Sequence, residues 1–125
     1  MADRKKIKAF VQGVLGCGCE EDVFQITDLR REQMAGHAYD RVNIGNRLLI
    51  YIFSSDDPEW IKSQLPGIVR AGKAERDARG FNRFRIVVAT DAPQVKRAAP
   101  EAYQRAHVTD DRVHLHVVGK AQVAF

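Results

Sequence analysis

The sequence has few cysteines and no long apolar run. Two cysteines among 125 residues are too few for the disulfide framework of a small secreted domain. The longest apolar run, Leu48 to Phe53, is far shorter than the roughly 20 residues that a membrane-spanning helix needs. The charged N-terminus leads into an amphipathic pattern and lacks the apolar segment of a secretory signal. We therefore expect a cytoplasmic protein without a membrane segment.

Proline is also scarce, and no linker or low-complexity tract divides the chain. The hydrophobic share of 45% and the charged share of 29% are those of an ordinary globular domain. We predict a single domain over residues 1–125. The P-loop, the dinucleotide-binding glycine motif, the nucleophile elbow and the HExxH zinc motif are all missing from the sequence. No residue can be assigned a catalytic role, and whether the protein is an enzyme stays open.

Two kinds of apolar pattern alternate along the chain. Apolar residues recur at helical spacing from Ile7 to Leu15, and Gly16 follows where helices commonly end. Compact apolar runs or shorter alternations predict four strands, at 23–31, 47–53, 84–89 and 112–118. The strand at 47–53 is apolar on both faces and should be central. The polar stretch 32–39 is interpreted as a connection.

Two strand ends are followed by helix-start signals, at 54–59 and 90–93. Pro66-Gly67 should break or kink the first of these helices, and Pro100 divides the second if it acts in the same way. Gly80 is expected to end the first helix.

These elements give the order α-β-β-α-β-α-β. The strand-helix-strand unit at 83–118 implies parallel neighbours, whereas the first two strands are close enough to pair antiparallel. We predict an α/β domain, with α+β as the alternative, built on a mixed four-stranded sheet with helices on its faces.

Cys17 and Cys19 are separated by Gly18 in a predicted turn, so both sulfurs can point the same way. Thiolates in this arrangement can bind zinc or iron, or exchange with a disulfide. The usual zinc spacing places two residues between the cysteines. The alternative is a tight turn in which the cysteines pack as small apolar residues.

The run from Leu15 to Phe24 reads L-G-C-x-C-x-E-x-V-F. It resembles a signature of small, functionally uncharacterised prokaryotic proteins. In that signature proline commonly follows the second cysteine, whereas Glu20 stands there in this chain. The resemblance covers about ten residues and implies no activity, cofactor or catalytic residue.

His114 and His116 lie two residues apart on a predicted strand, so they should share a face. With Cys17 and Cys19 they would complete a tetrahedral Cys₂His₂ zinc site. A polar strand face would produce the same pattern without any metal. His37 and His107 have no local partner and are interpreted as surface histidines.

The segment 70–85 has six basic and two acidic residues, a balance of +4 that equals the net charge of the chain. Such an excess can mark a surface for nucleic acid or another acidic partner. A solvated helix face gives the same count. The candidate contacts on the helical part are Arg70, Lys73, Arg76 and Arg79.

Asp56 and Asp91 each follow a predicted strand, at the edge where open α/β sheets bind ligands. They could present carboxylates to Mg²⁺, or each could cap the helix that follows. The apolar C-terminal segment 117–125 should pack on the domain or on a second subunit. The sequence thus leaves three hypotheses open: a thiol or metal site, a nucleic-acid or acidic-partner binding module, and a structural or oligomerisation domain.

Overall fold

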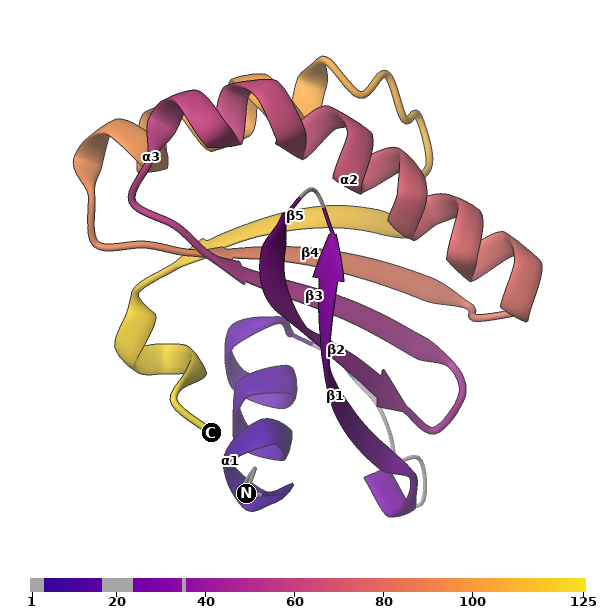
Figure 1. The fold of residues 1–125 in the computed structure, drawn as a ribbon. Helices are drawn as coiled ribbons and strands as arrows, with labels where there is room; N and C mark the ends of the chain where they lie inside the picture. The colour runs from indigo at the N-terminus through magenta and orange to yellow at the C-terminus, as the bar shows by residue number, and fades with distance from the viewer. Residues whose placement is uncertain (1–3, 17–23, 35) are drawn as a thin grey trace.

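A computed structural model describes residues 4–16, 24–34 and 36–125 of the chain (Figure 1). Within these residues, three α-helices and five strands form one mixed α/β fold. In chain order the elements are α1 (Arg4–Ala9), η1 (Phe10–Val14), β1 (Thr27–Met34), β2 (His37–Ile44), β3 (Leu48–Ser54), α2 (Pro58–Arg79), β4 (Arg83–Ala89), α3 (Pro93–Gln104), β5 (Val113–Val118) and η3 (Lys120–Val123).

The strands lie in the sheet in the same order as in the chain, from β1 to β5. β1, β2 and β3 form an antiparallel meander. β3, β4 and β5 are parallel, joined by α2 and α3. The mixed sheet and the parallel β4–α3–β5 unit agree with the sequence prediction.

The prediction of four strands was wrong, because β2 was not recognised. Residues 32–39, expected to be a connection, contain the end of β1 and the start of β2. The large apolar residues of β2 are divided between the two faces of the sheet: Tyr39 packs on the side of α2, and Val42 and Ile44 pack on the side of α1. Polar residues separate them, so no simple alternation marks this strand.

Helices cover both faces of the sheet (Figure 1). α2 and α3 pack on one face over a core centred on Phe53, Leu65 and Phe84. α1, η1 and the C-terminal segment pack on the other face, around Ile7 and Ile50. As predicted, β3 is buried on both faces from its first residue to its sixth.

The C-terminus packs on the domain itself. Phe125 contacts Phe10 edge to face, with 5.4 Å between the ring centroids. Segment 117–125 was expected to pack on the domain or on a second subunit, and the structure shows packing on the domain.

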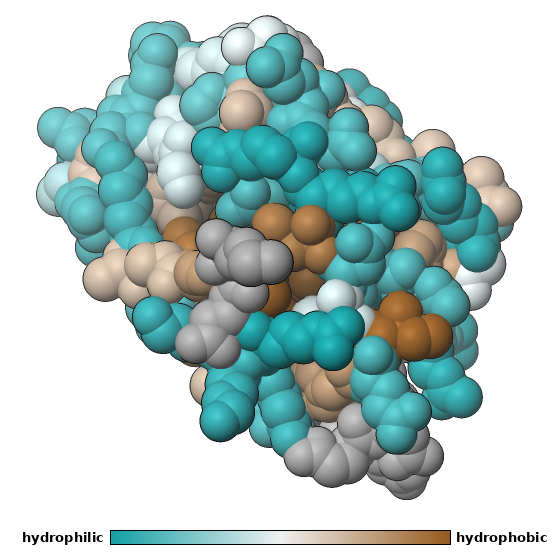
Figure 2. Space-filling view, turned by 60° about the horizontal axis from the view of Figure 1, so that its bottom comes forward, coloured by the Kyte–Doolittle hydropathy of each residue, from teal (hydrophilic) through white to brown (hydrophobic). Residues whose placement is uncertain are grey.

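With the bottom of the view in Figure 1 turned forward, the surface is mainly hydrophilic, with apolar residues in small areas (Figure 2). Among the described residues, the one large apolar side chain that is well exposed is Ile26.

Glycines end two helices in the left-handed conformation, as predicted. Gly16 has φ +69° after η1, and Gly80 has φ +74° at the end of α2. The amide of Gly80 donates to the carbonyl of Arg76. Only glycine adopts this conformation without steric cost, so both positions stop their helices sharply.

Proline does not break either long helix. α2 continues through Pro66 and α3 through Pro100, so the first of the two expected outcomes at Pro66, a break, does not occur. The carbonyl groups that lose an amide partner belong to Lys62 and Lys96, whose positions are exposed to water. Buried residues on both sides of Pro66 hold α2 against the sheet, so packing outweighs the lost hydrogen bond.

Candidate functional site

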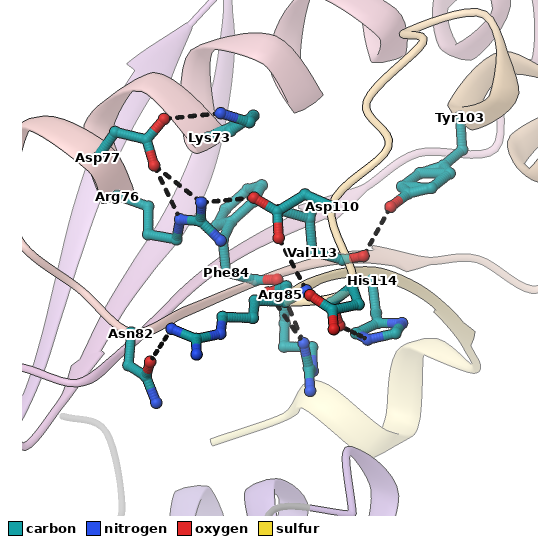
Figure 3. A network of polar contacts seen from close by, with 12 residues as sticks. Lys73, Arg76, Asp77, Asn82, Phe84, Arg85, Tyr103, Asp110, Val113 and His114 are labelled. Atoms are coloured by element: carbon teal, nitrogen blue, oxygen red, sulfur yellow. Dashed lines mark hydrogen bonds and ion pairs between the residues drawn. The ribbon is translucent and has the colours of Figure 1, made fainter.

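Basic side chains gather where β4 and β5 begin, on the sheet face that α1 covers. Arg85 pairs in register with His114, and Val87 pairs with His116. Because side chains alternate along a strand, Arg83 shares this face with Arg85. Figure 3 shows Arg85 and His114 on the same side of the sheet. We call the group formed by Arg83, Arg85, Arg112, His114 and His116 the basic corner.

Arg85 is half-buried in the basic corner without a compensating acid. Its Nη1 donates to the backbone carbonyls of Phe84, at 3.5 Å, and of Arg112, at 3.3 Å (Figure 3). In the part of the chain that the structure describes, it forms no ion pair with a carboxylate. Burial lowers the pKa of Arg85, and the neighbouring charge of Arg83 lowers it further. Arg85 therefore carries a positive charge that no carboxylate of the described residues pairs with.

The two histidines of the basic corner differ in their partners. His114 Nε2 lies 2.6 Å from the carbonyl oxygen of Asp111. A carbonyl oxygen only accepts, so this nitrogen is the protonated one. His116 Nε2 is buried and has no hydrogen-bond partner among the described residues. Burial, followed by the charges of Arg85 and His114, lowers the pKa of His116 and favours the neutral imidazole.

The histidine pair shares a face, as the sequence predicted. Cys17 and Cys19, the other expected metal ligands, lie outside the described residues. Within residues 4–16, 24–34 and 36–125, no three His, Cys, Asp or Glu side chains are grouped to hold a metal ion. The four-ligand site therefore stays a prediction.

The basic residues expected on α2 do not form one free cationic face. The side chain of Arg76 is 10% exposed and contacts Asp77 and Asp110 (Figure 3). Lys73 pairs with Asp77 at 2.7 Å, and Arg79 pairs with Glu75 at 3.2 Å. Of these four residues, Arg70 alone is both exposed and without an ion pair in the described part of the chain. α2 packs on the opposite face of the sheet from Arg85, so segment 70–85 contributes to two separate surfaces.

Asp56 and Asp91 do not cap the helices that follow them. Asp57 caps α2, because its carboxylate accepts from the amides of Glu59 and Trp60. Asp56 instead accepts from the hydroxyl of Thr90, at 2.8 Å, and from the ammonium group of Lys120. The α3 N-cap is Ala92, which has no side-chain hydrogen bond.

Asp91 accepts from the backbone amide of Lys120, at 3.3 Å. Together, Asp56 and Asp91 tie the carboxyl ends of β3 and β4 to η3. This is a structural role, and the Lys120 ammonium already neutralises the Asp56 carboxylate.

A second polar cluster, which the sequence did not reveal, lies between α2 and the β1–β2 hairpin. Glu75 of α2 binds Arg41 of β2 and accepts from the hydroxyl of Tyr51. Burial and the interaction with Glu75 raise the pKa of Tyr51, whereas Arg41 and Tyr51 hold the pKa of Glu75 below its usual value despite its burial. Arg41 could not be identified without β2, and Tyr51 reads as part of an apolar strand.

We found no match to this chain among protein-family models, curated proteins or solved structures. In the described residues, no helix is both long enough and apolar enough to cross a membrane. Functional conclusions therefore rest on the side chains described above.

Proposed function

We propose that the protein is a nucleic-acid binding module that contacts phosphates through the basic corner. The observation that carries this proposal is the half-buried guanidinium of Arg85, which lies beside other cationic groups and has no acidic partner among the described residues.

Partial burial of a cation removes hydration, and neighbouring positive charges add repulsion. Both effects operate at Arg85, because burial and Arg83 each lower its pKa. A group that served stability alone would gain from a nearby carboxylate, as Arg76 does from Asp110. A bound phosphate would supply that missing negative charge. Perturbed ionisable groups of this kind are enriched at functional sites.

The arrangement suits an extended polyanion better than a single enclosed phosphate. Residues two apart on a strand repeat every 6–7 Å or so, which places Arg83 and Arg85 in one row and His114 and His116 in the next. Arg83, Arg112 and His114 are exposed. Arginine contacts phosphate through two parallel hydrogen bonds, and it keeps its charge at every physiological pH.

Within segment 70–85, this proposal places the nucleic-acid contacts on β4 and not on α2, where the sequence analysis expected them. Arg76 and Arg79 are engaged in ion pairs, whereas Arg83 and Arg85 form none with the residues that the structure describes. Arg70, exposed on α2 across the sheet, then provides a matched control of the same residue type.

The test is fluorescence anisotropy with mixed-sequence single-stranded and duplex DNA over a series of salt concentrations. We expect log Kd to depend linearly on log salt, and each of Arg85→Gln and Arg112→Gln to reduce the slope by about 1. Arg70→Gln should leave the slope unchanged. Absence of binding at the lowest salt, or equal losses for Arg70→Gln and Arg85→Gln, would show that the basic corner is not the contact surface.

A zinc or iron site that includes Cys17 and Cys19 is the second candidate, favoured by the unpartnered Nε2 of His116. We expect about one equivalent of metal in protein purified without chelator, as for a structural site. A folded Cys17→Ser/Cys19→Ser variant should lose the metal, and His116→Gln should weaken its retention. If neither nucleic acid nor metal binds, the remaining hypothesis is a structural or oligomerisation domain.

A further inference from the structure

Two adjoining hollows lie between α2 and the β1–β2 hairpin, on the face opposite the basic corner. Their volumes are about 360 and 330 Å³. Both are lined by Arg30, Arg41 and Arg79, which come from β1, β2 and α2 respectively. We call this pair of hollows the Arg41 groove.

The structure holds Arg41 firmly in place. Its Nε lies 3.2 and 3.3 Å from the two carboxylate oxygens of Glu75, and its Nη2 lies 3.1 Å from Oε2. The ring of Phe81 lies 5.9 Å from its guanidinium carbon. The hydroxyl of Tyr51 fixes Glu75 in turn, by donating to Oε1. The Arg41 side chain is only 11% exposed, so its orientation is set before any ligand arrives.

One edge of this guanidinium is left for a ligand. Within the described part of the chain, the contacts of Arg41 to Glu75 use Nε and Nη2, and Nη1 has no acceptor. Guanidinium groups present five N–H donors in a fixed plane. Arg41 lines both hollows, so an oxyanion that entered either one would meet a preorganised donor. The larger hollow suits an oxyanion better, because its three arginines face one carboxylate, Asp28, whereas Glu32 and Glu75 both line the smaller one.

Two exposed arginines flank the fixed one. The side chains of Arg30 and Arg79 are 65% and 67% exposed. Their present partners are Asp28 and Glu75. The pair of Arg30 and Asp28 is exposed, and pairs of this kind contribute little stability, about 0–1 kcal/mol, so an incoming anion can replace Asp28 at small cost. Glu75 is only 21% exposed and stays bound to Arg41 and Tyr51, so Arg79 would contact the anion through its other N–H groups.

Polar groups at the rim provide further hydrogen bonds. Asn43 and Asn46 line the larger hollow and bind each other at 2.8 Å through their side-chain amides. The backbone amide of Asn46 also donates to Asn43 Oδ1, at 2.9 Å, and Asn46 itself is in the left-handed conformation. In these contacts the side-chain amide of Asn43 keeps one N–H for a ligand, and that of Asn46 keeps both.

We infer that the Arg41 groove binds a small oxyanion-bearing molecule, whose phosphate or carboxylate group contacts Arg41 Nη1 and is enclosed by Arg30 and Arg79. The site is independent of the basic corner, because the two lie on opposite faces of the sheet.

The test is a titration of the full chain, followed by ¹H–¹⁵N NMR, with inorganic phosphate in one arm and citrate in the other. We expect saturable shifts at Arg41, Asn43, Asn46 and Arg79. Shifts with phosphate alone would identify a phosphate ligand, and shifts with citrate alone would identify a carboxylate ligand. Shifts with both anions would show that the groove recognises their shared oxyanion chemistry.

Arg41→Lys keeps the charge but loses the planar donor set, and it should weaken binding by about tenfold or more. The double variant Arg30→Gln/Arg79→Gln leaves the Arg41–Glu75–Tyr51 contacts intact, so it tests the site even if Arg41→Lys does not fold. It should weaken binding several-fold.

Arg97→Gln, an exposed arginine on α3, is the matched control and should have no effect. Arg85→Gln should leave the shifts at Arg41, Asn43, Asn46 and Arg79 unchanged, which separates this site from the proposed nucleic-acid surface. The inference is overturned if the wild-type chain shows no saturable shifts with either anion, or if the double variant binds as tightly as the wild type.

Discussion

The ring of Phe84 occupies the space that a side chain at Gly72 would need. A β-carbon built on Gly72 would lie 2.0 Å from Phe84 Cζ, well inside van der Waals contact. Gly72 is buried in the middle of α2, and Phe84 is fully buried on β4. The close approach of this helix to the sheet therefore depends on a glycine at position 72.

Gly72→Ala should destabilise the protein. The added methyl group forces Phe84 or the helix to shift, and overpacking of a core typically costs about 1–3 kcal/mol. Urea denaturation monitored by circular dichroism measures the change. Gly67→Ala on the same helix is the control, because nothing lies within 4 Å of its β-carbon. That substitution should stabilise the protein by roughly 0.5–1 kcal/mol. A Gly72→Ala variant as stable as the control would show that α2 packs less closely than described.

The capping assignment predicts different costs for two aspartates. Asp57→Ala removes the acceptor for two amides at the start of α2 and should cost about 1 kcal/mol. Asp91→Ala should cost less, because α3 has no side-chain cap and only the contact to Lys120 is lost. Thermal unfolding of the two variants in parallel compares them. A larger loss for Asp91→Ala would contradict the assignment.

The part of the fold that the sequence predicted consists of elements with a strong local pattern. β3 is a continuous apolar run, and α2 begins with Asp57-Pro58 and ends at Gly80. β2 has no such pattern, because polar residues lie between its apolar ones on both faces of the strand. Its burial depends on pairing with β1 and β3. Pairing between strands, which no local pattern records, decides that this segment is a strand.

In the candidate sites too, features set by a local pattern could be predicted, and features set by strand pairing could not. Strand alternation was enough to place His114 and His116 on one face. Among the described residues, no acid pairs with Arg85, and this depends on the register between β4 and β5 and on the contact of Asp110 with Arg76. The Arg41 groove could not be predicted either, because Arg41 lies on β2 and this strand was not recognised from the sequence. A charge count over segment 70–85 therefore could not distinguish paired from unpaired arginines.

His116 predicts a specific dependence of stability on pH. Its pKa in the folded protein lies below the ordinary value of 6.5, so the unfolded chain binds this proton more readily. The free energy of unfolding should therefore decrease as the pH falls through 6.5 and below. His116→Gln should reduce that decrease, whereas His107→Gln, at an exposed position, should not. Urea denaturation at pH values on either side of 6.5 tests this. Equal pH slopes for the wild type and His116→Gln would exclude the burial described.

Arg76 and Asp110 link α2 to the turn that precedes β5 (Figure 3). Asp110→Ala leaves the buried guanidinium with Asp77 alone, and this should cost about 1–3 kcal/mol. The double variant Arg76→Met/Asp110→Ala removes the cation together with the acid that it contacts. It should be less harmful than Asp110→Ala alone, because apolar replacement of a whole buried ion pair is often tolerated. Chemical denaturation of both variants compares them. If the double variant is the more damaging, the ion pair contributes net stability beyond its packing.

The sheet has the same strand order in space as in sequence, and this has a consequence for folding. Each strand lies beside the one that precedes it in the chain, so no strand has to enter between two that have already paired. The meander β1–β2–β3 pairs through short connections, which keeps the entropy cost of loop closure low. β4 and then β5 add to an edge that is already formed, each after its own helix. A chain that emerges from the ribosome N-terminus first can therefore build this sheet in the order in which it is made.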